Sequence, residues 1–211
     1  MQDTRPTRFA GSWYPADPSR LRTLIEESFS RTSGTAVAGG PSGAEHSGPE
    51  HISADLSATG RFAGAVLPHA GLSFSGRGIA AGLQPLYEDA SLIRECDRIL
   101  LLAPSHYYRL PADTLYAGGF AAYDTPFGSI PGVGPTSHTR AAKEIAAEHA
   151  VEMLLPHVKY LRDNAGLAET EGPALEAVLV PPMSSSQLQR QARMLLDALG
   201  GSGSAAGTSN A

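Results

Sequence analysis

The stretch ILLLAPSHYY, residues 99–108, contains the pattern that decides the fold of this chain. A run of aliphatic residues that ends in Pro-Ser-His is typical of a buried strand with a polar side chain at its carboxyl end. The same pattern occurs earlier, in AVLPHAGLSFSG at residues 65–76, where His69 follows the apolar run. Because the carboxyl ends of strands in an open α/β sheet line the binding crevice, we expect His69 and His106 to share one pocket.

Strands and helices alternate along the rest of the chain. Residues 123–132, YDTPFGSIPG, are rich in turn formers and predict a turn-rich connection. The alternation predicts an α/β fold with a central, mostly parallel sheet that helices flank. The apolar segments that we expect to form strands are Phe62–Leu67, Arg98–Ala103, Thr114–Phe120 and Leu175–Val180.

Helix boundaries are marked by residues with strong local preferences. Asp17 is expected to cap the first helix, with Pro18 at its first position. Pro156 is expected to mark a break after the helical stretch that precedes it, and Ser186 to cap the last helix. The helices that the periodicity predicts cover Leu21–Phe29, Ile79–Leu86, Ala141–Leu155 and Gln187–Leu199.

The chain is predicted to form a single domain over residues 1–199. Within it, Arg31–Gly60 is dominated by Gly, Ala, Ser, Pro and Glu without periodicity, which predicts a disordered insertion. His46 and His51 lie in that insertion and are expected to be solvated. The last residues, Gly200–Ala211, are predicted to be a flexible tail.

Composition excludes several classes of protein. A net charge of −5 provides no basic surface for nucleic acid. The sequence has no apolar stretch of membrane-spanning length, and its amino-terminal residues lack the apolar core of a signal peptide. The single cysteine, Cys96, rules out an internal disulfide framework and suits a reducing compartment. We therefore expect a soluble cytoplasmic protein without a nucleotide cofactor.

Five short motifs occur in an order that resembles the Memo family, also called AmmeMemoRadiSam system protein B. Each motif alone is weak, but five in register are specific. The resemblance covers residues from Arg8 to about Leu199 and implies a fold like that of the extradiol-type non-haem iron dioxygenases. The motifs are AGSWYP at Ala10–Pro15, PHAGLSFSG at Pro68–Gly76, APSH at Ala103–His106, DTPFG at Asp124–Gly128 and EHAVEMLLP at Glu148–Pro156.

The resemblance also implies a metal site. Family members bind iron or copper through the His of PHAG, the His of PSH and a late cysteine, and the first two correspond to His69 and His106 here. The chain lacks the family's Asp-Phe-x-His segment and the late cysteine. We therefore interpret it as the amino-terminal two thirds of a Memo-like protein with an incomplete metal site.

A third metal ligand must come from elsewhere in the chain, because iron oxygenases of the facial type need an anionic one. Glu148 could supply a carboxylate, and His149 a third imidazole. We expect Glu148 instead to cap the helical turn that follows it, and His149 to pack against the sheet edge. Both would then act near the pocket rather than as direct ligands. Cys96 precedes its strand, at the wrong end for the crevice, and is expected to be an ordinary half-buried thiol.

Two functions follow from these observations. The first is a metal-dependent, dioxygenase-like redox protein in which His69 and His106 hold iron or copper weakly, with little turnover by this chain. The second, also implied by the resemblance, is a non-enzymatic adaptor in cell-motility signalling. Such an adaptor would bind a phosphotyrosine-containing or acidic peptide in the same crevice.

Overall fold

A four-stranded sheet in the order β4-β9-β5-β8 lies at the centre of the computed structural model. The structure describes residues 2–32, 54–56, 62–133 and 139–200. Strands β4 and β9 run parallel over their full lengths, as do β5 and β8, while β5 is antiparallel to β9. Most pairings in this sheet are therefore parallel, as predicted. Its strands are β4 (Arg98–Pro104), β9 (Ala174–Val180), β5 (Tyr116–Ala117) and β8 (Thr139–Arg140).

Two smaller sheets complete the strand arrangement. One has the order β1-β6-β7, and the other pairs β2 with β3 in antiparallel fashion. The strand predicted from Phe62 therefore forms, but it pairs with β2 and not with β4. The irregular insertion predicted over Arg31–Gly60 is wrong for Ala54–Leu56, which form β2. The strands are β1 (Gln2–Arg5), β6 (Phe120–Thr125), β7 (Gly128–Pro131), β2 (Ala54–Leu56) and β3 (Phe62–Ala65).

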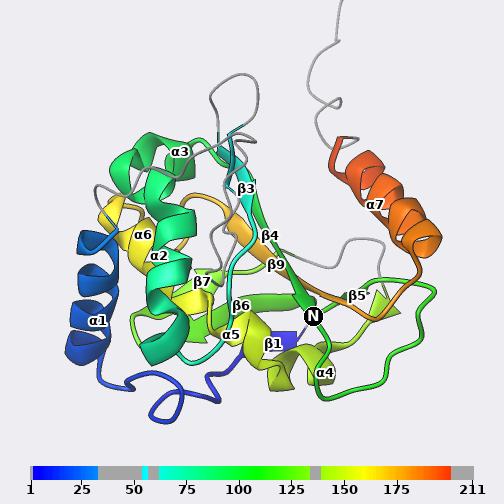
Figure 1. The fold of residues 1–211 in the computed structure, drawn as a ribbon, viewed down its shortest axis with the longest axis horizontal. Coiled ribbons are helices and arrows are strands. Elements are labelled where there is room, and N and C mark those ends of the chain that lie inside the picture. Colours follow the sequence, from blue (N-terminus) through cyan, green and yellow to red (C-terminus); the bar gives the residue numbers. More distant parts are fainter. Residues whose placement is uncertain (1, 33–53, 57–61, 134–138, 201–211) are drawn as a thin grey trace, which may run out of the picture.

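Helices cover both faces of the central sheet, which confirms the predicted α/β class (Figure 1). On one face, Leu101 and Leu175 pack against the short helices α4 and α5. On the other face, Val178 packs against Leu195 of α7, which stands apart from the remaining helices in Figure 1. The helices are α1 (Pro18–Ser30), α2 (Leu72–Glu88), α3 (Ala90–Arg94), α4 (Ala142–Ala147), α5 (His149–Glu152), α6 (Leu155–Asn164) and α7 (Ser185–Gly200).

Helix α1 begins where its sequence predicts. The Asp17 side chain accepts a hydrogen bond from the Arg20 N–H at 2.8 Å, and Pro18 occupies the first turn. Leu21, Ile25 and Phe29 then recur at four-residue spacing and are fully buried against α2 and α6. A stripe of this kind positions the helix through burial of its apolar face.

Glycines divide the predicted strand over Thr114–Phe120, and that prediction is wrong. Strand β5 ends at Ala117 and β6 begins at Phe120, while Gly119 between them has a φ of 65°, a left-handed conformation that favours glycine. The predicted turn-rich connection is also wrong in part, because it contains most of the β6–β7 hairpin. Gly128, with a φ of 108°, begins β7 directly after the turn.

The predicted helix over Ala141–Leu155 is interrupted, and α4, α5 and the first residue of α6 lie within it. Its backbone becomes extended at Glu148, between α4 and α5. The break predicted at Pro156 occurs just before it, since α5 ends at Glu152 and Pro156 lies in the first turn of α6. A first-turn proline is well tolerated because its missing N–H would have no partner within the helix. The cap predicted at Ser186 is also wrong, since Ser186 lies inside α7. Ser184 caps α7 instead, through its hydroxyl and the N–H of Gln187 at 3.3 Å.

Several predictions concern residues outside the described part of the chain. These are the disordered insertion apart from Arg31, Thr32 and Ala54–Leu56, the tail apart from Gly200, and the side chains of His46 and His51. Among the helices that the structure describes, none has the length and apolar character that crossing a membrane would require.

Candidate metal centre

Three histidines from distant parts of the sequence meet at one place. His69 lies between β3 and α2, His106 follows β4 by two residues, and His149 is the first residue of α5. Each offers one nitrogen, and the three nitrogens lie within 4.8 Å of one another. The ring centroids of His69 and His106 are 5.2 Å apart, and those of His106 and His149 are 4.4 Å apart. The structure thus brings the predicted pair together and adds His149.

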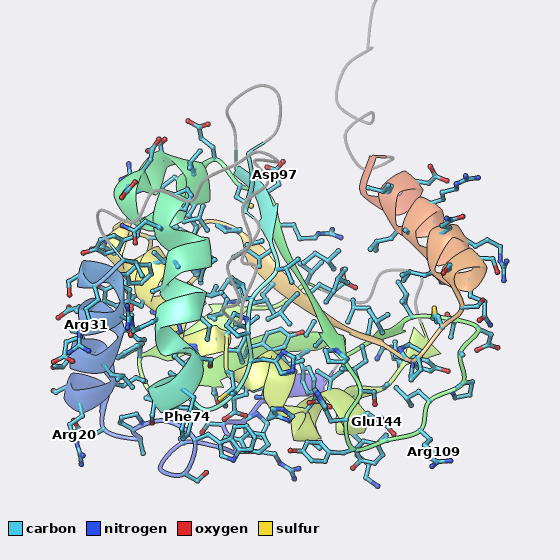
Figure 2. The ribbon with its side chains drawn as sticks, viewed as in Figure 1. Arg20, Arg31, Phe74, Asp97, Arg109 and Glu144 are labelled. Atoms are coloured by element: carbon cyan, nitrogen blue, oxygen red, sulfur yellow. The ribbon has the colours of Figure 1, made fainter. Side chains whose placement is uncertain are left out.

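The cluster lies on the side of the molecule toward which β4 runs. Figure 2 shows Phe74 of α2, Glu144 of α4 and Arg109 of the segment after β4 along that same rim. Phe74 and Arg109 are exposed at the rim. This is the end of the sheet where an α/β fold places its binding crevice.

Glu148 forms the base of the cluster and is almost completely buried, with 1% of its surface exposed. Its Oε2 accepts the backbone N–H of His106 at 2.8 Å, and its Oε1 accepts the N–H of Ala150 at 3.1 Å, which caps α5 as predicted. The same Oε1 lies 2.8 Å from His106 Nδ1. The carboxylate therefore contacts a histidine of the cluster directly.

Aromatic side chains surround His149. The ring centroid of Trp13 lies 4.7 Å from that of His149, with Tyr107 at 5.5 Å and Phe9 at 6.2 Å. Tyr107 is half exposed, whereas Trp13 and Phe9 are partly buried. His149 therefore packs against aromatic rings as well as against the other two imidazoles.

Burial keeps two of the imidazoles neutral. It is the main cause that lowers the pKa of His69, reinforced by the neighbouring His106 and opposed by Glu148. Burial also lowers the pKa of His149, again with Glu148 acting in the opposite direction. Both rings are therefore neutral at pH 7, and neutral imidazole is the form that ligates a metal ion.

One nitrogen of His149 supports a site for an ion. His149 Nδ1 is buried and forms no hydrogen bond with the described residues. It lies 3.1 Å from Glu148 Oε1, close enough for electrostatic attraction, but the angles of this contact are not those of a hydrogen bond. A ring with a buried nitrogen left unsatisfied, beside two further imidazoles, has the donor chemistry that iron, copper and zinc accept.

The side chains of Cys96 and Ser105 are not part of the histidine cluster. Cys96 precedes β4, at the opposite end of the strand from His106; its half-buried thiol donates to the carbonyl of Arg98, and burial raises its pKa. The Ser105 hydroxyl donates to the carbonyl of Tyr108 at 2.7 Å. Neither side chain is oriented toward nucleophilic chemistry with His106.

A buried ion pair near the cluster was not predicted from the sequence. Arg5 Nη1 donates to Glu152 Oε2 at 2.7 Å, and both side chains are fully buried. Arg5 Nη2 also donates to the backbone carbonyl of Glu148 at 3.2 Å. Glu152 accepts the Tyr14 hydroxyl at 2.8 Å; burial, and then the charge of Glu152, raises the pKa of Tyr14. The pair fixes the amino-terminal strand to the helices that bear Glu148 and His149.

A shallow hollow of about 420 Å³ is lined in part by Trp13, which contacts His149 of the cluster. Its walls include Ser12, Trp13, Asp17, Arg20 and Ser73, and none of the three clustered histidines lines it. The hollow therefore adjoins the imidazoles through Trp13 but does not contain them.

Comparison with known proteins relates this geometry to a family. The family model described as Memo-like protein matches residues 5–170. A MEMO1 family protein of Desulfurococcus amylolyticus is 30% identical over 161 residues, which cover 72% of this chain and 50% of the relative. A MEMO1 family protein of Methanopyrus kandleri is 30% identical over 167 residues, which cover 74% and 52%. The chain thus spans about half the length of the curated relatives that it matches.

Proposed function

Because this chain belongs to the family of Memo-like proteins, we propose that it binds one transition-metal ion through His69, His106 and His149. The observation that carries the proposal is the convergence of three nitrogens within 4.8 Å of one another. The ligand count is then three instead of the two expected from the sequence. Three protein ligands leave positions on the ion open for a further molecule.

The ion that we propose is iron or copper, in a redox role. Either metal would supply electron transfer and chemistry with dioxygen when bound. The protein's own contribution is to keep His69 and His149 neutral and to exclude water on one side. Trp13 and Phe9 cover His149 on that side, and Tyr107, which also contacts His149, is half exposed.

Metal titration of the purified protein tests this proposal. We expect one equivalent of iron(II), added without oxygen, or of copper(II) to bind and to quench the fluorescence of Trp13, the single tryptophan, because it contacts His149. His106→Ala and His149→Ala should each weaken binding by at least about 100-fold, or about 2.7 kcal/mol. Elemental analysis provides the stoichiometry.

Cys96→Ser is the matched control for this titration and should bind as the wild type does, since Cys96 lies at the other end of β4. Binding that survives in His106→Ala at full affinity would place the metal elsewhere and contradict the proposal.

The hollow beside Trp13 favours a second function, recognition of an acidic or phosphotyrosine-containing peptide. Arg20 lies on its wall and is exposed, so a phosphate could pair with its guanidinium while the phenyl ring rests on Trp13. We expect a phosphotyrosine peptide to shift the fluorescence of Trp13, and Arg20→Ala to abolish that shift. The unphosphorylated peptide is the control, and equal binding of both peptides would contradict this function.

A further inference from the structure

One carboxylate oxygen faces two of the three clustered imidazoles. Glu148 Oε1 lies 2.8 Å from Nδ1 of His106 and 3.1 Å from Nδ1 of His149. The His106 contact has hydrogen-bond geometry, whereas the His149 contact does not. Both rings therefore turn the same nitrogen toward Glu148, and Nε2 of each ring is the nitrogen that does not face it.

The position of this carboxylate is fixed without help from the imidazoles. The backbone N–H of His106, on the segment after β4, donates to Oε2, and the N–H of Ala150, in the first turn of α5, donates to Oε1. The backbone of Glu148 is held as well, because its carbonyl accepts a hydrogen bond from the buried Arg5. A carboxylate anchored in this way can impose an orientation on a neighbouring ring.

A carboxylate in contact with an imidazole determines which ring nitrogen carries the proton. An ionised carboxylate only accepts hydrogen bonds, so Nδ1 of His106 must be the donor. In the neutral ring, Nε2 is then left with its lone pair free. This is the tautomer that ligates a metal through Nε2, and partners of this kind orient metal-binding histidines in other proteins.

We propose that Glu148 is a positioning residue that holds His106 in the Nδ1–H tautomer and leaves the lone pair of its Nε2 free for a metal ion. The tautomer of His106 is inferred from the contacts of Glu148 alone, whereas its effect on metal binding rests on the proposed function. His149 meets the same oxygen without hydrogen-bond geometry, so the orienting effect falls mainly on His106.

Glu148→Gln separates this role from a purely structural one. The glutamine amide preserves the size of the side chain and can still accept a backbone N–H through its oxygen. Its nitrogen is a donor, however, and where it replaces Oε1 it would donate to His106 Nδ1 and shift the proton to Nε2. The protonated Nε2 could not ligate a metal ion. Removal of such an orienting partner lowers metal affinity by about 10–100-fold in other proteins.

The experiment reads the tautomer directly, in the metal-free protein. Long-range proton–nitrogen NMR correlations of labelled histidine at pH 7.5 should show His106 as Nδ1–H in the wild type and as Nε2–H in Glu148→Gln. Zinc(II), which is redox-inert, should bind Glu148→Gln about 10–100-fold more weakly than the wild type. Glu144→Gln, on the neighbouring α4, is the matched control and should leave both readouts unchanged.

The tautomer measurement and the metal titration distinguish failure of the positioning role from failure of the proposed function. An Nε2–H tautomer of His106 in the wild type would overturn the positioning role, whatever happens to Glu148→Gln. The positioning role is also overturned if Glu148→Gln folds and leaves both the tautomer and the zinc affinity unchanged. If the wild type has the Nδ1–H tautomer but binds no zinc, iron or copper, the proposed function fails while the positioning of His106 by Glu148 stands.

Discussion

Glu152→Gln is expected to lower the free energy of unfolding by about 3–5 kcal/mol, because it leaves a buried charge without its partner. The Glu152 carboxylate pairs with Arg5 at 2.7 Å, and neither side chain is exposed to solvent. It also accepts the backbone N–H of Phe9 at 2.8 Å and the Tyr14 hydroxyl. A glutamine can satisfy some of these donors but cannot neutralise the guanidinium. Urea unfolding at pH 7, followed by circular dichroism, measures the loss.

An exposed ion pair of the same kind provides the control. Glu27 of α1 lies 3.7 Å from Arg31, the residue directly after that helix, and more than half of each side chain is exposed. Glu27→Gln should therefore change stability by less than about 0.5 kcal/mol. The double variant Arg5→Met, Glu152→Gln should lose less than the sum of the two single variants, since it no longer buries an unpaired charge. Equal urea midpoints for Glu152→Gln and Glu27→Gln would refute a contribution from the buried pair.

Acid is expected to destabilise the protein through His157. This side chain of α6 is completely buried beside the ring of Phe29, and neither of its nitrogens has a hydrogen-bond partner among the described residues. Burial lowers its pKa to about 3; the backbone of Met153 acts in the opposite direction, but its contact lacks hydrogen-bond geometry and the effect of burial is larger.

The sign of the effect follows from where the proton binds. In the unfolded chain His157 takes up a proton below about pH 6.5, whereas the folded protein resists protonation down to about pH 3. Stability is therefore unaffected above pH 6.5 and falls progressively as the pH drops toward 3. The free energy of unfolding should fall by about 1.4 kcal/mol per pH unit in this range, so that about 3 kcal/mol is lost by pH 4.

His157→Leu isolates this contribution from that of the acidic residues. The variant should lose less stability than the wild type between pH 7 and pH 4, because the carboxyl groups titrate equally in both proteins. Urea midpoints at the two pH values provide the comparison. A variant whose stability falls as steeply as that of the wild type would rule out His157 as the cause.

Elements with strong local signals could be predicted from the sequence. Asp17 and Pro18 mark the start of α1, and Leu21, Ile25 and Phe29 repeat at helical spacing, so no distant contact is needed to form this helix. The segment around Gly119 could not be assigned in the same way. Its apolar residues suit one strand, but the chain changes sheets there, and the partners of β5 and β6 lie far away in sequence.

The residues of the candidate site also differ in how far local sequence predicts them. His69 and His106 could be found because each follows an apolar run, and strand ends converge by the geometry of the sheet. The place of His149 depends on the extended backbone at Glu148, whose side chain is held by the N–H of His106, 42 residues earlier. No local sequence pattern predicts a contact of this kind. The buried pair of Arg5 and Glu152 could not be predicted either. In the sequence, nothing distinguishes these two residues from charged residues on the surface.

The link between Arg5 and Glu152 also constrains the order of events during synthesis. The two residues are separated by 147 positions, and β1 pairs with β6, whose residues begin at Phe120. A nascent chain therefore cannot anchor β1 through these contacts until the segment from Phe120 to Glu152 has left the ribosome. Closure of so long a loop is slow compared with the formation of a helix. The hydrogen bond from Arg5 to the carbonyl of Glu148, at the base of the histidine cluster, can form only after that closure.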